Sequence, residues 1–278
     1  MKYNITQRGA EIEIGSCFDL KNTFDCGQCF RWNENPDGSY SGIVKNRDVR
    51  IFRDGNCVVI ENCTNEDFDG IWKKYFDLDT SYDNIRMEIT QLCPSLKCAV
   101  DSINGIRILN QEPWEALCSF IISQNNNIPR IKGIVSRLCE GFGDKCGSGY
   151  TFPSAQVIGR LEADDLAPLR AGFRARYIID AARKVSDGSV DLEKMYYAPI
   201  ADCRKELMTI VGVGAKVAEC TLLYGLHRLE AFPVDVWMKK ALADQFSGIS
   251  VQSLGRYAGI AQQYIFHYTR SQAAAINS

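Results

Sequence analysis

The segment MTIVGVGAKVAEC constrains the fold of this chain more than any other stretch. It holds two glycines, Gly212 and Gly214, and a lysine, Lys216, follows almost at once. A dinucleotide-binding loop needs a third glycine three positions after Gly214, where this chain has Val217. A Walker-type phosphate loop needs glycine, lysine and serine or threonine in succession, and Ala215 interrupts that order. Neither nucleotide-binding loop therefore fits.

The sequences on either side of the glycines are typical of helices. DCRKELMTI precedes them, and KVAECTLLYGL follows with Val217, Cys220 and Tyr224 at helical spacing. The pattern predicts a helix–hairpin–helix, in which glycine permits the turn and unpaired N–H groups at the second helix start face a phosphate. Lys216 falls in the first turn, where the helix dipole favours a neutral, nucleophilic amine. The alternative is an ordinary surface lysine.

Composition places the chain among soluble globular proteins, with 46% apolar and 24% charged residues over 278 positions. No apolar run reaches the roughly 18 residues that a membrane span requires, and we expect no secretory signal in the polar start MKYNITQRGAEIEI. The net charge of −2 argues weakly against nucleic acid as a partner. However, basic residues concentrate in segments 130–137 and 170–184, and the position of charge matters more than its sum.

Twelve cysteines occur in the chain, many of them in apolar segments. Without a secretory signal, we expect reduced intracellular thiols rather than disulfides. Cys26 and Cys29 have the spacing of a redox pair, although no βαβ pattern surrounds them. A redox protein remains an alternative, which predicts dithiol turnover abolished by Cys29→Ser. The only two histidines, His227 and His267, lie far apart in sequence, so no metal site is expected.

The first part of the chain is typical of β-structure and the rest of helices. FRWNENPDGSYSGIV and VRIFRDGNCVVIEN each place β-forming runs around a turn, and we predict two antiparallel hairpins. Helical periodicity begins near Tyr82. It continues in EPWEALCSFIISQ, with Pro113 in the first turn, in RARYIIDAARKVSDG, ending at Gly188, and in SLGRYAGIAQQYIFHYTR. A small antiparallel sheet followed by a pair of helical subdomains is the predicted organisation.

The stretch AFPVDVWMKKAL adds an aspartate at the start of the next helix. Asp235 has the position of an N-cap, which is worth about 1 kcal/mol. A glycine hairpin, a lysine, a helix and then Pro-Val-Asp together resemble the helix–hairpin–helix DNA glycosylase superfamily with its Gly/Pro-Asp signature. The resemblance implies that Lys216 attacks C1′ of a damaged nucleotide and that Asp235 is the essential carboxylate.

Further stretches resemble the 8-oxoguanine DNA glycosylase/AP lyase branch of that superfamily. CGQCFRW resembles the segment in which a glycine carbonyl, here that of Gly27, accepts from the N7–H of the oxidised base; the alternative is a simple turn glycine. In AGIAQQYIF, Gln262 and Phe266 are four apart and share a helical face. The resemblance implies that Gln262 binds the Watson–Crick edge, that Phe266 stacks on the base, and that Cys220 forms the opposite wall.

Two more stretches resemble the family's contacts with the strand opposite the lesion. In SFIISQNNNIPRIKG, Asn125 is expected to enter the gap left by the flipped base and Arg130 to read the opposite cytosine. In AGFRARY, Phe173 and Arg174 are expected to wedge the duplex and contact that cytosine. A polar loop with a phosphate-binding arginine remains the alternative for Asn125 and Arg130. Many relatives have tyrosine at the position of Phe173.

Residues of the hairpin and of the helix after it are expected to meet the DNA backbone. The resemblance implies phosphate contacts at Gly212 and Gly214 and a structural cation on the backbone carbonyls of Ile210 and Val213. Trp237 stands where eukaryotic relatives often have a phosphate-contacting histidine, so that contact is expected to differ.

The resemblance covers the chain from about Asp19 to Phe266 and implies an α+β fold. A small antiparallel β-sheet domain (TBP-like) spans residues 1–98, and a mostly α-helical, two-subdomain helix–hairpin–helix core spans residues 99–278, with the hairpin at about 203–226. The implied function is base excision repair: release of 8-oxoguanine, preferably opposite cytosine, through a lysine Schiff base, followed by strand cleavage by β-elimination. We expect no cofactor, a monomer acting on double-stranded DNA, no membrane, and a prokaryotic cytoplasm and nucleoid, or a nucleus if the source is eukaryotic.

Two rival functions share parts of this pattern. An alkylpurine glycosylase of the same superfamily uses the aspartate without the lysine, so Lys216 counts against it. A non-catalytic binder of DNA structure predicts that Lys216→Gln is tolerated. Relatives that hold an iron–sulfur cluster place four cysteines after the catalytic region, whereas this chain has none after Cys220.

Overall fold

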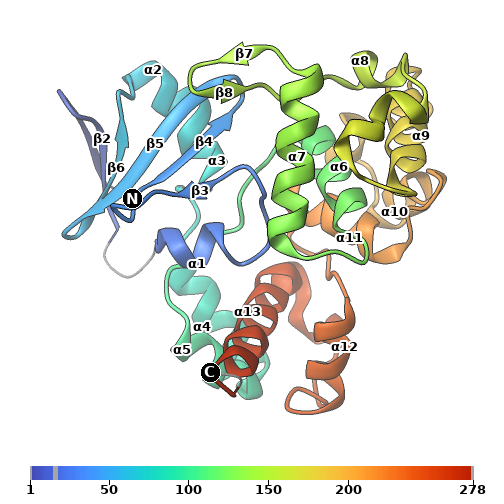
Figure 1. The fold of residues 1–278 in the computed structure, drawn as a ribbon. Coiled ribbons are helices and arrows are strands. Elements are labelled where there is room, and N and C mark those ends of the chain that lie inside the picture. The colour runs from blue at the N-terminus through green and yellow to red at the C-terminus, as the bar shows by residue number, and fades with distance from the viewer. Residues whose placement is uncertain (1, 15–17, 277–278) are drawn as a thin grey trace.

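The computed structural model of the chain describes residues 2–14 and 18–276. An antiparallel sheet forms the N-terminal part and helices form most of the rest, which confirms the predicted α+β class (Figure 1). No helix within these ranges is long and apolar enough to cross a membrane.

The sheet has six antiparallel strands in the order β1-β2-β6-β5-β4-β3. The strands are β1 (Tyr3–Thr6), β2 (Gly9–Glu13), β3 (Asn33–Glu34), β4 (Tyr40–Val44), β5 (Arg47–Asp54) and β6 (Cys57–Glu61). Both predicted hairpins are present, as β3–β4 and β5–β6. Their turns contain Gly38 and Gly55, which have positive φ values of 79° and 57° that glycine adopts without strain.

Aromatic side chains fill the space between the sheet and the short helix α1 (Leu20–Phe24). Phe24 stacks on Trp32 with ring centroids 4.2 Å apart, and the Trp32 indole N–H donates to the Tyr75 hydroxyl at 2.8 Å. Tyr75 ends the compact turn formed by α2 (Asn65–Asp67), a π-helix (Phe68–Trp72) and α3 (Lys73–Tyr75). A separate hydrophobic core therefore belongs to the sheet.

The second hydrophobic core lies among the helices. These are α4 (Tyr82–Leu92), α5 (Lys97–Ser102), α6 (Pro113–Ser123), α7 (Ile128–Phe142), α8 (Ala155–Gly159), α9 (Arg174–Ser186), α10 (Ile200–Leu207), α11 (Ala215–Tyr224), α12 (Val236–Ala243) and α13 (Ala258–Ile276). Pro113 is the first residue of α6, and Gly188 follows the end of α9 with φ 79°, as predicted. Every residue from Ala116 to Ile122 is buried because α7, α9 and α11 surround α6, so its apolar surface is wider than one face.

The apolar side chains of α4 belong to the core of the helices rather than to the core of the sheet. Ile85 and Ile89 are buried there, and α5 packs against α13. The predicted domain boundary at residue 98 stays a prediction. The two hydrophobic cores show which side chains pack together, but they do not mark where one domain ends along the chain.

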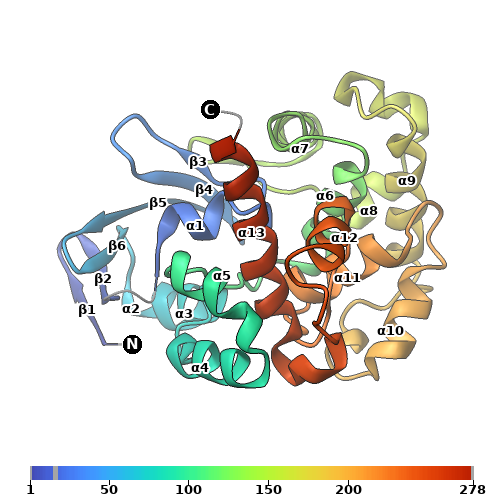
Figure 2. The same ribbon diagram turned by 90° about the horizontal axis from the view of Figure 1, so that it is seen from below.

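Helix α13 crosses the molecule between the sheet and the bundle that contains α6 and α11 (Figure 2). In the N-terminal half of α13, Gln263 Nε2 donates to the Cys26 carbonyl oxygen at 3.4 Å. The C-terminal helix is thereby joined to the loop that follows α1, so residues far apart in the sequence meet at one place.

Candidate active site

Lys216 is the second residue of α11, on the α10–α11 hairpin that the sequence predicts. Its Nζ donates to Ser123 Oγ at 3.0 Å and lies 5.1 Å from the centroid of the Phe120 ring. Both partners come from the C-terminal half of α6. The half-buried amine is therefore held between two helices rather than extended into solvent.

Side chains of α9 hold the hairpin in place. The Val211 N–H donates to Asp180 Oδ2 at 2.7 Å, and Lys184 Nζ contacts Asp180 Oδ2 at 3.0 Å and the Thr209 carbonyl at 2.5 Å. Gly212 has φ 78°, and a Cβ at this position would lie 2.3 Å from the Tyr177 ring. The hairpin therefore requires glycine at position 212 for both conformation and space.

We expect Gly212→Ala to lower the free energy of unfolding by about 2 kcal/mol or more, because the methyl group displaces the Tyr177 ring and alanine resists positive φ. Urea unfolding measures the change. Gly214→Ala is the matched control, since nothing lies within 4 Å of a Cβ there. An equal loss of stability in both variants would contradict the assignment.

Asp235 is the N-cap of α12, as predicted. Its Oδ1 accepts from the Met238 N–H at 2.9 Å, while no hydrogen bond to Oδ2 occurs within the described part of the chain. The carboxylate is half-buried, and the next two side chains, Val236 and Trp237, are exposed. One oxygen therefore holds the helix and the other remains available to a ligand.

Glu219 ties the helix of Lys216 to the loop that leads to Asp235. Arg204 of α10 pairs with both carboxylate oxygens, and Oε2 also accepts from the Phe232 N–H at 2.8 Å. The ion pair is largely shielded on the Glu219 side, and Phe232 is three residues before Asp235. This carboxylate thus fixes the relative positions of Lys216 and Asp235.

Cys220 lies one helical turn after Lys216 and is buried. Burial raises the pKa of its thiol to about 11, the Lys216 amine lowers it, and the Asp235 carboxylate raises it. Lys216 and Cys220 share one face of α11, and Glu219 ties this helix to the segment that leads to Asp235. The structure brings together the predicted nucleophile, its carboxylate and one predicted wall of the base pocket.

The other predicted parts of the base pocket also meet. Gly27 has φ 88°, and a Cβ added there would lie 3.7 Å from Phe266 Cε1 and 3.6 Å from an Arg270 nitrogen. The Arg270 guanidinium carbon lies 5.4 Å from the Phe266 ring centroid. Gln262 is buried beside Tyr224 of α11. Segment 26–29, α11 and α13 therefore surround one region.

Sequence reasoning missed three residues of this region, namely Ser123, Tyr224 and Arg270. Tyr224 lies four residues after Cys220 and eight after Lys216, so helical spacing could have placed it on their face. Ser123 and Arg270 reach the region only through tertiary packing.

The predicted opposite-strand residues form a second group around the loop after α6. Asn125 and Arg130 are exposed, and Asn125 has φ 47°, the left-handed region that asparagine tolerates. Phe173 is 43% exposed and lies 4.4 Å from the Arg174 guanidinium. The structure thus gathers Asn125, Arg130 and Phe173 near the surface.

Arg174 differs from the other three because it is only 4% exposed. Its guanidinium donates to the carbonyls of Gln124 (2.8 Å from Nε), Asn125 (3.1 Å) and Ala171 (3.1 Å). Burial lowers its pKa, with Arg130 adding to the effect. In this structure Arg174 supports the loop of Asn125, so its predicted contact with cytosine requires it to exchange partners.

The hairpin glycines and the carbonyls proposed for a cation lie together at the tip of the hairpin. The Ile210 carbonyl accepts from the Val213 N–H at 3.0 Å, which closes the turn. Among the described residues, no group of three or more His, Cys, Asp or Glu side chains is placed to hold a metal ion. A cation on backbone carbonyls stays a prediction.

Cys26 and Cys29 are buried free thiols. Burial raises the pKa of Cys26 to about 12 and that of Cys29 well above its usual value. A thiolate at neutral pH is what dithiol chemistry requires, so this environment argues against the redox alternative.

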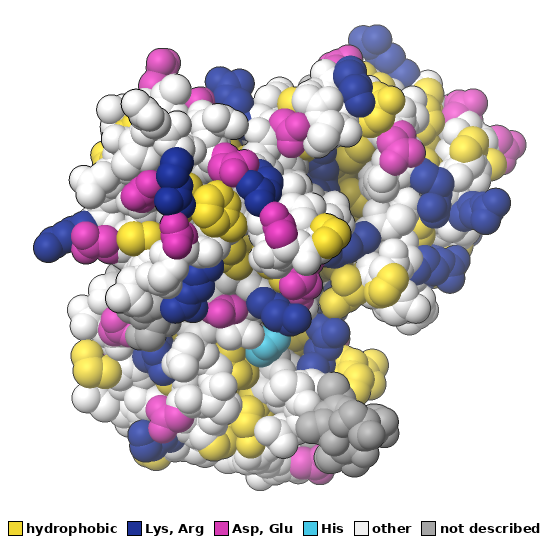
Figure 3. All heavy atoms as spheres, turned by 60° about the vertical axis from the view of Figure 1, so that its left-hand side comes forward, with side chains coloured by type: hydrophobic (Ala, Val, Ile, Leu, Met, Phe, Trp, Pro, Cys, Tyr) yellow, Lys and Arg dark blue, Asp and Glu magenta, His cyan; other side chains and the backbone are white. Residues whose placement is uncertain are grey.

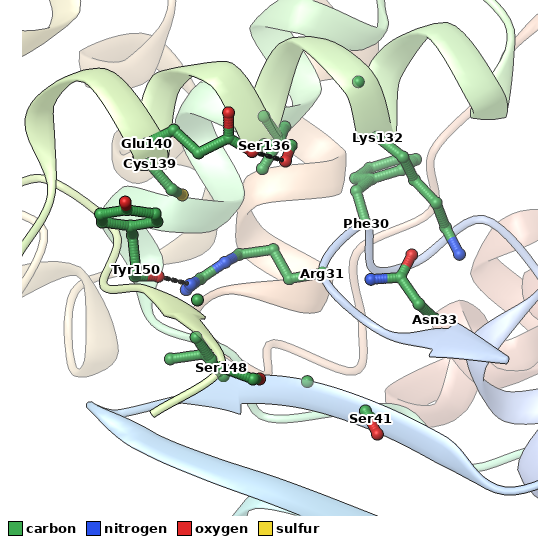
Figure 4. Close-up of a pocket in the computed structure, with 15 residues that line it drawn as sticks. Phe30, Arg31, Asn33, Ser41, Lys132, Ser136, Cys139, Glu140, Ser148 and Tyr150 are labelled. Carbon is green, nitrogen blue, oxygen red and sulfur yellow. Dashed lines mark hydrogen bonds between the residues drawn. The ribbon is translucent and has the colours of Figure 1, made fainter. Parts of the chain in front are cut away.

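A cavity of about 420 Å³ lies elsewhere, between β4 and α7 (Figure 4). Arg31 points into it from the sheet side and is bonded to Glu115 at 3.0 Å and to the Tyr150 carbonyl at 2.5 Å. Neither Lys216 nor Asp235 lines this cavity. The geometry of Lys216 and Asp235, rather than the size of the cavity, locates the candidate active site.

The chain matches two family models and several known proteins. The family model described as "8-oxoguanine DNA glycosylase, N-terminal domain" matches residues 12–117, and that described as "HhH-GPD superfamily base excision DNA repair protein" matches residues 118–250. The N-glycosylase/DNA lyase of Saccharomyces cerevisiae is 35% identical over 254 residues, covering 80% of this chain and 66% of the yeast protein. The chain thus spans just under two thirds of that relative.

Two solved structures are similar over almost the whole chain. MBOgg1 in complex with a low affinity DNA ligand has a TM-score of 0.92 and 40% identity, covering 98% of this chain and 100% of that one. The Clostridium acetobutylicum 8-oxoguanine glycosylase/lyase, in complex with double-stranded DNA containing cytosine opposite 8-oxoguanine, has a TM-score of 0.90 and 36% identity, covering 98% and 99%. Since both family models match and both solved proteins are at least 36% identical over nearly the whole chain, this chain belongs to the 8-oxoguanine DNA glycosylase family of the helix–hairpin–helix superfamily.

Proposed function

We propose that the protein is a bifunctional DNA glycosylase/AP lyase that removes 8-oxoguanine from duplex DNA and then cuts the strand. The observation that carries the proposal is the placement of the Lys216 amine on Ser123, with Glu219 fixing its helix relative to Asp235. A lysine and a carboxylate held in this way suit covalent attack on a sugar carbon that develops positive charge.

The reaction begins when the damaged nucleotide leaves the base stack, at a cost of a few kcal/mol. Phe266 and Cys220 enclose the base and Gln262 binds its Watson–Crick edge. The Gly27 carbonyl accepts from N7–H of 8-oxoguanine, whereas guanine presents an acceptor at N7 and the contact becomes repulsive.

Lys216 then attacks C1′ through the lone pair of its amine, and the C1′–N9 bond breaks with its electron pair leaving on the base. Asp235 stabilises the positive charge that develops on the sugar. Opening of the sugar ring gives a Schiff base between Nζ and C1′. Loss of a C2′ proton expels the 3′ phosphate by β-elimination, which cuts the strand on the 3′ side of the lesion.

The partner strand is held by the second group of residues. Asn125 fills the vacancy in the stack, Phe173 wedges the duplex, and Arg130 and Arg174 contact the orphan cytosine. Gly212 and Gly214 bring the hairpin backbone to a phosphate. Basic side chains stand on either side of a concavity at the right-hand edge of the face in Figure 3, which suits a polyanion.

The proposal places the protein with the DNA, in a nucleoid or a nucleus. A bacterial or archaeal nucleoid is the finer proposal, supported by the 36% identity with the clostridial enzyme along nearly all of both chains.

Single-turnover assays test the proposed function. We expect release of free 8-oxoguanine and a 3′ strand cut on a duplex with one 8-oxoguanine opposite cytosine, and no detectable release from the same duplex with guanine. Duplexes with adenine, guanine or thymine opposite the lesion measure the preference for cytosine. A protein that binds the duplex but releases no base would contradict the proposed catalysis and would have a DNA-binding role only.

We expect Gly27→Ala to slow excision of 8-oxoguanine about a hundredfold, because alanine resists φ 88° and the carbonyl turns from the base. Cleavage of an abasic duplex should stay within about threefold, since it needs Lys216 but no base contact. Gly38→Ala is the control, with a similar φ of 79° in a turn remote from the site. An equal fall in both reactions would show a general folding defect instead.

A further inference from the structure

Three buried polar side chains lie in the wall of the proposed base pocket. Tyr224 is 4% exposed, Gln262 is 3% exposed and Gln263 is fully buried. Buried polar groups are costly unless they are hydrogen-bonded, so their arrangement is specified by the fold. Gln262 is the proposed reader of the base, whereas Tyr224 and Gln263 have no part in the mechanism above.

The hydrogen bonds of these residues have a definite direction. Gln263 Nε2 lies 3.4 Å from the Cys26 carbonyl oxygen, which only accepts, so the amide nitrogen must face Cys26. Gln263 Oε1 then faces Tyr224 and accepts from its hydroxyl at 2.5 Å. A tyrosine hydroxyl has one proton, and this short contact takes it. Burial raises the pKa of Tyr224 well above its usual value, so that proton is retained.

The Tyr224 hydroxyl donates its single proton to Gln263, so it can only accept a hydrogen bond from Gln262. Its Oε1 lies 3.4 Å from the Tyr224 hydroxyl oxygen, and two oxygens without a proton between them repel. A half-turn of the carboxamide leaves its shape almost unchanged and places Nε2 there as a donor. The carbonyl oxygen of Gln262 then faces the pocket.

We propose that Tyr224 and Gln263 are positioning residues that fix the Gln262 carboxamide with its carbonyl oxygen towards the bound base. The inference rests on the proposed function and names what that site selects on the Watson–Crick edge. The hydrogen bonds run in one direction from Gln262 through Tyr224 and Gln263 to Cys26. Because Cys26 precedes Gly27, the groups that bind the two edges of the base are anchored at adjacent residues.

An oxygen at this position selects purines that carry a hydrogen on N1. 8-Oxoguanine offers N1–H and N2–H₂ as donors to Gln262 Oε1. 8-Oxoadenine keeps the N7–H that Gly27 binds, but its N1 is an acceptor and repels the oxygen. The two bases therefore present the same N7–H to Gly27 and different Watson–Crick edges to Gln262. Comparing them measures the contribution of the Gln262 carboxamide.

The experiment measures single-turnover excision of 8-oxoguanine and of 8-oxoadenine from otherwise identical duplexes, each opposite cytosine. The readout is the ratio of the two rates in wild type, Tyr224→Phe and Gln263→Met. Tyr197→Phe is the matched control. It removes the same hydroxyl group from a side chain that is 93% exposed. Where 8-oxoadenine is excised too slowly to follow, the same substitutions are made in the Lys216→Gln protein. The readout is then the ratio of its affinities for the 8-oxoguanine duplex and the 8-oxoadenine duplex. Thermal unfolding confirms that each variant is folded.

Tyr224→Phe is expected to lower the ratio about tenfold, because the carboxamide turns freely once its partner is lost. Gln263→Met is expected to lower it further. In that variant the Tyr224 proton turns to Gln262 Oε1 and fixes the carboxamide in the opposite orientation, with Nε2 towards the base. Tyr197→Phe should leave the ratio unchanged.

An unchanged ratio in both pocket variants overturns the proposal. Equal losses of both rates, with the ratio preserved, show that Tyr224 and Gln263 only stabilise the fold and also overturn it. A wild-type protein that releases neither base would refute the proposed function itself. These failures are distinguishable because only the last one affects the wild type.

Discussion

Lys216→Gln is expected to abolish borohydride trapping on a duplex with 8-oxoguanine opposite cytosine, and to slow base release about ten thousandfold or more. A glutamine amide has no nucleophilic lone pair, so no Schiff base forms for borohydride to reduce. Glutamine is polar and only one bond shorter than lysine, and position 216 is half-buried, so the fold and DNA binding should be retained. The measurement is a denaturing gel of the covalent adduct beside a binding isotherm.

Lys97→Gln provides the matched control for this substitution. Lys97 is exposed on α5 and pairs with Asp101, one turn away, so trapping should equal that of the wild type. A Lys216→Gln protein that still forms an adduct would mean that another amine is the nucleophile. A wild type that binds the duplex but forms no adduct would reduce the hairpin to a DNA-binding element.

Asp235→Asn is expected to slow excision about a thousandfold while leaving stability almost unchanged. Asparagine is as good an N-cap as aspartate, and its Oδ1 can still accept from the Met238 N–H. The free energy of unfolding should therefore change by less than about 0.5 kcal/mol. Only the negative charge facing the sugar is removed, so the loss appears in the rate of the chemical step.

Asp235→Ala separates the two roles of this carboxylate. It removes both charge and cap, so the rate falls as in Asp235→Asn and the free energy of unfolding also falls by about 1 kcal/mol. Urea unfolding and single-turnover rates measure the two quantities on the same samples. Full activity in Asp235→Asn would show that the carboxylate serves only the helix.

Local patterns in the sequence predicted the parts of the site that depend on short spacing. The hairpin, the place of Lys216 in the first turn of α11 and the N-cap at Asp235 all follow from residues within one or two turns of one another. Their physical causes, positive φ at glycine and unpaired N–H groups at helix starts, act locally.

Contacts between distant segments could not be read from such patterns. The hydrogen bond from Gln263 to Cys26 joins residues 237 positions apart, and the path of α13 beside segment 26–29 depends on the packing of both cores. Arg174 is a second example of a contact that the sequence pattern did not predict. The resemblance predicted a contact with DNA, whereas in the structure its guanidinium donates to three backbone carbonyls. The resemblance named the candidate residues, and both their importance and the roles assigned to them remain predictions.

Arg174 also has a consequence for how the enzyme searches DNA. In the free protein its guanidinium binds the backbone that presents Asn125 and lies over the Phe173 ring, so these two side chains are held together before any exchange of partners on DNA. A stiff probe loses little conformational entropy when it enters a duplex. We infer that the loop of Asn125 is already ordered in the free protein, so no loop needs to fold at each step of a search along DNA.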